Sequence, residues 1–111
     1  MPFYIQPGFV LPQQQTILPC MQTNTQKHQA FTSEPMGKKR VTAIPGVGRI
    51  YGKRFAKQRY LTAENLYGQF LVLSRQRDLF IAFFNKVIQR QDYVNAIVCY
   101  NALLEWYKNF A

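Results

Sequence analysis

Three glycines and three cations lie within nine positions of one another in this sequence, and together they could bind a phosphate group. Gly46 and Gly48 allow backbone angles that are closed to other residues, and they leave no side chain in front of the main-chain amides. The amides that begin the following helix are then unpaired, with the positive end of the helix dipole behind them. We therefore predict a phosphate-binding turn surrounded by the cations Arg49, Lys53 and Arg54.

The segment that must position this turn has the pattern of a helix-hairpin-helix motif. A short helical turn precedes it, and residues 49–58 form the second arm. We expect Val47 to fill the gap between the arms and Gly52 to let them pack closely. Ile50 and Phe55 are expected to point inward. Such a motif contacts the sugar-phosphate backbone, so it positions a nucleic acid without reading its sequence. The alternative is a glycine-rich turn beside a solvated basic face.

The charge of the chain favours an anionic partner. Lys and Arg number 14 against 5 Asp and Glu, which gives a formal net charge of +9, and every charged residue lies from Lys27 onward. Such a field attracts phosphate polymers, but it also attracts anionic membranes or keeps a protein soluble. Charge alone therefore leaves the class of partner open.

The sequence contains no grouping with the spacing that catalysis or metal binding needs. His28 is the one histidine, and the five carboxylates are scattered, with no pair at acid–base or metal-ligand spacing. Cys20 and Cys99 support neither a disulfide framework nor a zinc site. We expect no enzymatic activity, no cofactor, no small-molecule substrate and no membrane insertion.

The beginning of the chain differs in composition from the rest. Residues 1–22 are uncharged, interrupted by proline and without helical or strand periodicity, so we expect a disordered extension. Thr25 is the expected cap of a first helix, which must end before Pro35.

The later part of the chain is predicted to be helical. Thr62 caps one helix, and Asp78 caps or opens the next. A last helix, from about Asp92 to residue 109, carries apolar and aromatic residues at alternating spacings of three and four, which is one helical face. We therefore predict a compact all-α domain of five to six helices over residues 23–111.

Six stretches of the sequence follow one another in a specific order and spacing. They are Gln26-Lys27-His28 with Phe31, Glu34-Pro35-Met36-Gly37, Gly46-Val47-Gly48, Leu66-Tyr67-Gly68-Gln69-Phe70-Leu71-Val72-Leu73, Asp78-Leu79-Phe80, and Leu104-Glu105-Trp106 with Phe110. On these stretches the chain resembles the barrier-to-autointegration factor family, as a diverged and basic member, from about Thr25 to Phe110. Met21 stands where chains of that family begin, so we expect that translation can start there.

The resemblance implies a domain that dimerises through a central apolar helix. The interface residues that it implies are Gly68, Gln69, Phe70, Leu71 and Leu73. This segment is apolar on too many sides for an exposed helix of a monomer, which independently calls for a partner surface. A small residue at position 68 would let the two-fold-related helix approach closely. The alternative is that the segment is simply the central core helix.

The resemblance also implies binding and bridging of double-stranded DNA without sequence preference. The family binds LEM-domain proteins and lamins, and it is found in the nucleus, at the nuclear envelope and on chromatin, and also in the cytoplasm. The DNA-binding residues carried over are Gln26, Lys27, Gly46, Val47, Gly48, Ile50 and Arg54, beside which Arg49 and Lys53 add charge. Lys27 near a helix N-terminus would oppose the dipole, so a phosphate partner would help to explain its placement.

Thr23 and Thr25 are predicted phosphorylation sites. A phosphate next to Lys27 would add about two negative charges, repel DNA and pair with that lysine. Both residues are equally plausible as simple caps of the first helix.

Two departures from the family pattern bear on the partners. Residues 92–95 offer no cation, whereas the family has a basic contact at the start of its last helix, and residues 74–77 are Ser-Arg-Gln-Arg where the family is acidic. The alternative function is therefore a DNA-poor paralogue that heterodimerises with a family member and modulates LEM-domain binding. For the main function, Gly46→Glu is expected to abolish DNA binding with little loss of fold.

Overall fold

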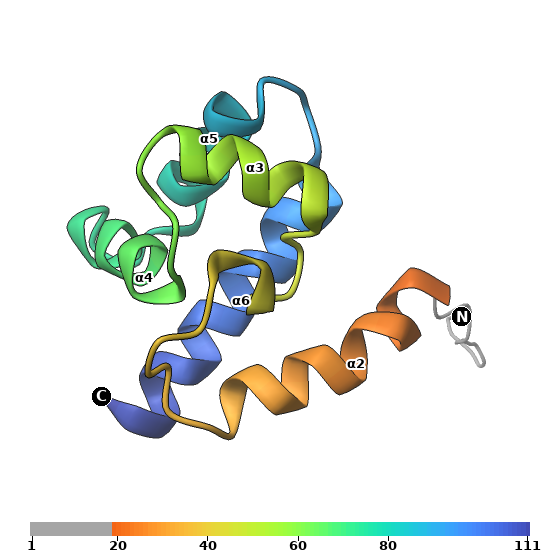
Figure 1. Ribbon diagram of the computed structural model, residues 1–111, viewed down its shortest axis with the longest axis vertical. Coiled ribbons are helices and arrows are strands. Elements are labelled where there is room, and N and C mark those ends of the chain that lie inside the picture. Colours follow the sequence, from red (N-terminus) through yellow and green to blue (C-terminus); the bar gives the residue numbers. More distant parts are fainter. Residues whose placement is uncertain (1–18) are drawn as a thin grey trace, which may run out of the picture.

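The computed structural model describes residues 19–111, with side chains from residue 26 onward. The described part consists of five α-helices and one short 3-10 helix (Figure 1), in the order α2 (Pro19–Thr32), η2 (Val41–Ala43), α3 (Arg49–Lys57), α4 (Ala63–Val72), α5 (Arg77–Ile88) and α6 (Tyr93–Phe110). The predicted all-α class and the number of helices are confirmed.

The predicted cap Thr62 begins α4, and α6 begins after Asp92, where the last helix was expected to start. The Thr62 hydroxyl accepts a hydrogen bond from the Asn65 amide at 3.2 Å, and the Asn65 side chain accepts one from the Thr62 amide at 3.1 Å, which is a reciprocal capping box for α4. The Asp92 carboxylate caps α6 by accepting the Asn95 amide at 3.0 Å. Asp78 lies in the first turn of α5, where its charge faces the positive end of the helix dipole.

The first described helix, α2, begins earlier than expected. It starts at Pro19, so the prediction that Thr25 caps it was wrong, and Lys27 lies more than two turns inside the helix rather than near its N-terminus. Residues 19–22, assigned above to a disordered extension, form the first turn of α2, and residues 1–18 lie outside the described part. The side chains of Thr23 and Thr25 are also outside it, so their phosphorylation stays a prediction.

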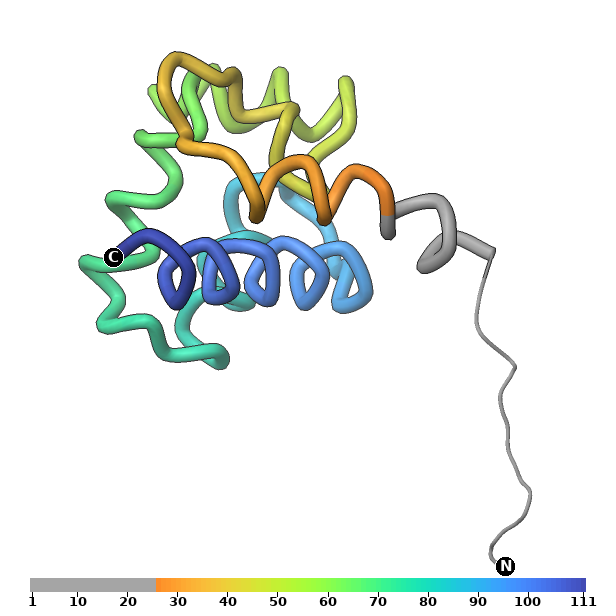
Figure 2. The backbone as a smooth tube through the Cα atoms, turned by 90° about the horizontal axis from the view of Figure 1, so that it is seen from below, coloured from red at the N-terminus to blue at the C-terminus, as the bar shows by residue number. Residues whose placement is uncertain are grey.

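The helices pack around α6. This helix contacts α5, α2 and α4, while α3 packs against α5 and η2. Figure 2 shows α2 and α6 running side by side in the same direction. Their C-terminal ends are tied by hydrogen bonds from Trp106 Nε1 to the Glu34 carbonyl at 3.0 Å and from Asn109 Nδ2 to the Thr32 carbonyl at 2.9 Å. This packing brings the N-terminal end of α6 to the turn that precedes α3.

The core is rich in phenylalanine. The side chains of Phe55, Phe70, Phe80 and Phe84 are fully buried, and the ring centroids of Phe55 and Phe84 lie 5.2 Å apart in an edge-to-face arrangement. Burial of each such ring contributes about 1.5–3 kcal/mol. The predicted apolar face of α6 is buried from Ala96 to Leu103 and becomes exposed only toward the C-terminus. The helices are thus held by a single aromatic core, which fixes the position of the turn before α3.

Residues 19–111 contain neither a helix suited to spanning a membrane nor a cluster of metal-ligating side chains. None of the helices there combines the length and the apolar character needed to cross a membrane. Nor do side chains of His, Cys, Asp and Glu in the described part gather in threes as metal ligands do. The absence of enzymatic activity stays a prediction.

Candidate phosphate-binding site at the glycine turn

The glycine turn, residues 45–48, joins η2 to α3 and rests against α6. Gly46 has a φ of +90°, which only glycine adopts readily. A Cβ at this position would lie 2.5 Å from the Asn95 carbonyl oxygen and 3.0 Å from the Cys99 amide nitrogen, both in the backbone of α6. The expectation that Gly46→Glu would leave the fold intact was therefore wrong, because no side chain fits there.

The two arms of the turn are closely packed, as predicted. Val47 is fully buried between them, and a Cβ on Gly52 would collide with the side chain of Thr42. The first arm is only a three-residue 3-10 helix, not an α-helix. Phe55 points inward as expected, but Ile50 does not: 63% of it is exposed, because the second position of α3 faces away from the core.

Gly48 differs from Gly46 in both its backbone conformation and its surroundings. Its φ of −90° and ψ of −168° are open to any residue, so the prediction that it needs special backbone angles was wrong. Nothing lies within 4 Å of the place where its Cβ would be. As the N-cap of α3, it precedes amides that have no intrahelical partner, and within the described residues the amides of 48–51 donate no hydrogen bond. These N–H groups face open space.

The amides open into a hollow of about 480 Å³. Its lining comes from α2, the glycine turn, α3, the α5–α6 loop and α6: Lys27, Gly46, Val47, Gly48, Arg49, Ile50, Tyr51, Arg90 and Asn95. Six of the predicted DNA-binding residues are therefore brought together. The lining includes three cations and no carboxylate, so the site suits an anion.

Lys27 crosses from α2 to the glycine turn. Its Nζ donates a hydrogen bond to the Val47 carbonyl at 3.1 Å. Partial burial lowers the pKa of this ammonium group, because removal from water penalises the charged form. No carboxylate pairs with it among the described side chains. A phosphate in the hollow would provide that missing charge and raise the pKa of Lys27 again.

Residues 22–110 match the family profile described as barrier to autointegration factor. The chain is 36% identical to barrier-to-autointegration factor of Danio rerio, over 81% of this chain and 99% of that protein. It is 36% identical to the Drosophila melanogaster protein, with the same two coverages, and 35% identical to the Homo sapiens protein, over 76% of this chain and 93% of that protein.

The chain belongs to the barrier-to-autointegration factor family. The resemblance noted in the sequence is thereby confirmed. Membership rests on almost the whole described domain, including the glycine turn, α4 and α6.

Three predicted DNA-binding residues of this family member lie outside the hollow. Gln26 is exposed on α2, and Lys53 lines a separate hollow of about 370 Å³ beside α3. Arg54 Nη1 donates to the Ile88 carbonyl at 2.5 Å, and 3.5 Å separate it from Gln89 Oε1. The guanidinium of Arg54 thus holds the C-terminal end of α5, and its contact with a phosphate stays a prediction.

Asp92 ties three helices together below the hollow. The hydroxyl of Tyr51 on α3 donates to its carboxylate, the Asn95 side chain on α6 donates at 2.8 Å, and the Asp92 amide donates to Asn85 Oδ1 on α5 at 3.0 Å. Burial alone would raise the pKa of Asp92, but these hydrogen bonds and the charge of Arg90 outweigh it, so the pKa is lowered. Burial, and next the bond to Asp92, raise the pKa of Tyr51.

Asp92→Asn is expected to lower stability by about 1 kcal/mol at pH 7, because the charged form strengthens the hydrogen bonds while asparagine still caps the helix. A carboxyl whose pKa is lowered by folding stabilises the folded state at pH values above its unfolded pKa of about 3.9. This stabilisation is lost as the pH falls through the folded pKa. Urea unfolding of both proteins at pH 7 and pH 2.5 measures this. We expect the difference in free energy of unfolding between the two proteins to be smaller at pH 2.5. An equal difference at both pH values would contradict the stabilising role of the Asp92 carboxylate.

Three residues that line the hollow were not assigned to it from the sequence: Tyr51, Arg90 and Asn95. No spacing signal could have found Arg90, because it lies in the loop after α5 and reaches the glycine turn only through the packing of α3 on α5. It supplies charge beside residues 92–95, where the sequence offers none.

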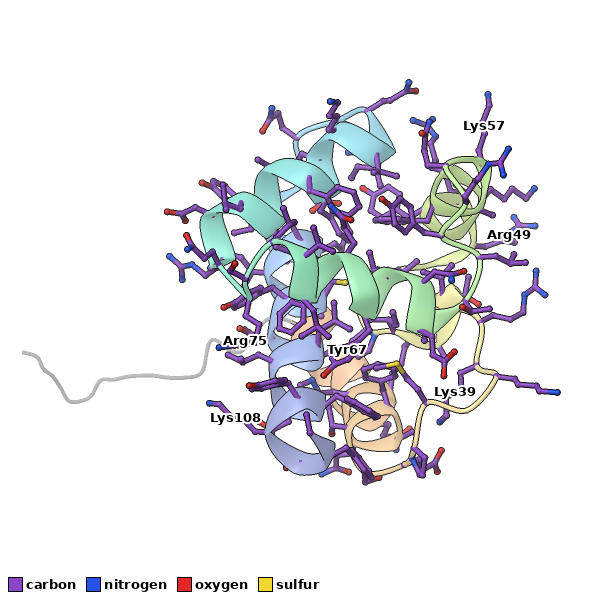
Figure 3. All side chains as sticks on the ribbon, turned by 90° about the vertical axis from the view of Figure 1, so that its left-hand side faces the viewer. Lys39, Arg49, Lys57, Tyr67, Arg75 and Lys108 are labelled. Atoms are coloured by element: carbon purple, nitrogen blue, oxygen red, sulfur yellow. The ribbon has the colours of Figure 1, made fainter. Side chains whose placement is uncertain are left out.

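The predicted dimer segment lies on α4, which crosses the front of the molecule in Figure 3. Nothing lies within 4 Å of a Cβ built on Gly68, and 41% of Leu71 and 74% of Val72 are exposed. Phe70 is fully buried in the core of its own chain, so its assignment to the interface was wrong. Val72, which was not in the predicted set, is more exposed than any of the residues in it.

Proposed function

We propose that this chain binds double-stranded DNA without sequence preference and bridges two duplexes as a homodimer, in the organisation of chromatin and the nuclear envelope. The observation that carries this proposal is the row of unpaired amides at residues 48–51. These amides face a hollow that contains Lys27, Arg49 and Arg90 and no carboxylate. Main-chain N–H groups at a helix start, with cations around them, bind phosphate oxygens.

The absence of sequence preference follows from the chemistry of the hollow. Phosphate is common to every nucleotide, and contacts to it position a protein without distinguishing bases. Phosphates alone occur in both single and double strands, so the preference for a duplex rests on family membership.

Bridging requires two glycine turns in one particle. The exposed Leu71 and Val72 beside the uncovered Gly68 form an apolar surface that a second copy would bury. An isologous contact places the same patch of each copy against the other. Each dimer would then carry two phosphate-binding turns, one for each duplex.

LEM-domain proteins and lamins are the further partners that we propose from family membership. The loop after α4 carries Arg75, and α5 begins at Arg77; the Arg75 guanidinium lies over the Tyr107 ring at 4.6 Å from its centroid. A cation held on an aromatic ring in this way presents positive charge beside the apolar surface of α4.

A salt titration of duplex binding tests the proposal. With three cations in the hollow, and about 0.9 in slope expected for each neutralised phosphate, the slope of log affinity against log salt should be at least about 2.7 in magnitude. Duplexes of unrelated sequence should give equal affinities. The alternative, a DNA-poor paralogue that heterodimerises with a family member, predicts a flat curve and negligible binding at low salt.

A further inference from the structure

Arg90 lies in the loop between α5 and α6, where two hollows meet. It lines the 480 Å³ hollow at the glycine turn and also a neighbouring hollow of about 630 Å³, which is lined by both Lys86 and Asp78. Within the part of the chain that the structure describes, its guanidinium forms no hydrogen bond and no ion pair. Its positive charge acts on Asp92, whose pKa it helps to lower.

The loop that carries Arg90 is fixed in place. Gln89 before it adopts a left-handed conformation with a φ of 61°, and the Arg90 amide donates to the Asn85 carbonyl at 3.3 Å. On one side of Arg90, Arg54 of α3 binds the Ile88 carbonyl at 2.5 Å. On the other side, Tyr51 of α3 binds Asp92. The helix that begins at the glycine turn therefore holds the loop on both sides of Arg90.

We propose that Arg90 is a phosphate-binding residue of the glycine-turn site, and that Arg54 is a positioning residue that fixes the Arg90 loop beside the turn. This inference rests on the proposed function. A cation at the start of the last helix is absent from residues 92–95, and Arg90 delivers the same charge from the preceding loop. A guanidinium binds phosphate with two parallel N–H groups, whereas the ammonium of Lys27 acts as a point charge.

The geometry gives the two arginines different tasks. Arg54 uses its guanidinium on the carbonyl end of α5, where positive charge is favourable. Arg90 has no such bond and lines the same hollow as the free amides and Lys27. A phosphate at the amides of 48–51 would therefore meet Arg90.

Arg90→Ala is expected to reduce the magnitude of the salt slope for duplex binding by about 0.9 and the affinity by about tenfold at moderate salt. Arg90→Lys should restore the slope but only part of the affinity. The matched control is Lys108→Ala, which removes one charge on the side of the molecule away from Arg49 and Lys57 (Figure 3) and should leave the slope unchanged. Thermal melts of each variant verify the fold.

The outcomes separate this inference from the proposed function. If Gly48→Glu abolishes binding while Arg90→Ala binds with the wild-type slope, the proposed function stands and the role of Arg90 is overturned. Equal losses in Arg90→Ala and Lys108→Ala would also overturn it, since only net charge would matter. If the wild-type chain ignores duplexes at low salt, both proposals fall.

A double-mutant cycle tests the positioning role of Arg54. Arg54→Met should weaken binding in the wild-type chain but have little further effect in the Arg90→Ala background, because Arg54 acts through Arg90. The reverse finding, equal losses in both backgrounds, would mean that Arg54 contacts DNA by itself and would overturn this part of the proposal.

Discussion

Gly48→Glu is expected to weaken duplex binding by at least about a hundredfold and to leave the domain folded. A side chain at residue 48 meets nothing within 4 Å at its Cβ, and the backbone there is extended, so glutamate fits without strain. Its carboxylate would stand in front of the amides of 48–51 and repel a phosphate. The loss of two charge-assisted hydrogen bonds, at about 1.5–3 kcal/mol each, already amounts to a hundredfold.

Fluorescence anisotropy with a labelled duplex at low salt measures this loss, and thermal melts followed by circular dichroism measure the fold. Gly48→Ala is the matched control, since it adds a methyl group without charge and should cost less than about tenfold in affinity. A Gly48→Glu variant with wild-type affinity would show that the phosphate does not bind at the start of α3.

Gly46 is unsuited to the same experiment. Any Cβ there meets the Asn95 carbonyl oxygen at 2.5 Å in a backbone conformation with positive φ. Strain and overpacking of this kind cost about 2 kcal/mol or more. Loss of binding by a Gly46 variant would therefore report a damaged turn, whereas loss by a Gly48 variant reports the binding surface.

Much of this fold is predictable because its signals are local. Thr62 and Asp92 cap helices through bonds to amides three residues later, and Pro35 limits how far α2 can extend. The alternating three-and-four spacing of apolar residues along α6 similarly identifies its buried face. The glycine turn itself is visible for the same reason, since its residue types are consecutive.

The division of tasks within the site is not local, and the sequence does not reveal it. Gly46 and Gly48 are the same residue type, and only the approach of α6 shows that packing requires the first, whereas the second has open space around it and could accept a side chain. The same holds for Arg54 and Arg90. The guanidinium of Arg54 binds the carbonyl end of α5, whereas that of Arg90 has no such bond and lines the hollow at the glycine turn. Thr25 resembles a cap but lies inside a helix that begins at Pro19.

Gly68→Glu is expected to turn the proposed dimer into a monomer and to abolish bridging, while each chain still binds one duplex. Within its own chain Gly68 has open space around it, so the substitution does not disturb the core. In a dimer that buries Leu71 and Val72 against their copies, two glutamates would be brought close to the two-fold axis and lose water without gaining a partner. Leaving such charges buried and unpaired costs several kcal/mol, enough to separate micromolar chains.

Light scattering measures the mass of each variant, and co-sedimentation of two differently labelled duplexes measures bridging. Gly68→Ala is the control, because a methyl group is small enough to leave the dimer in place or to weaken it only slightly. The glycine turn lies between η2 and α3, and the exposed residues of α4 do not line its hollow, so the salt slope per chain should survive in the monomer. A monomeric Gly68→Glu protein that still joined two duplexes would mean that one chain carries two DNA-binding surfaces, and the second copy would then be unnecessary for bridging.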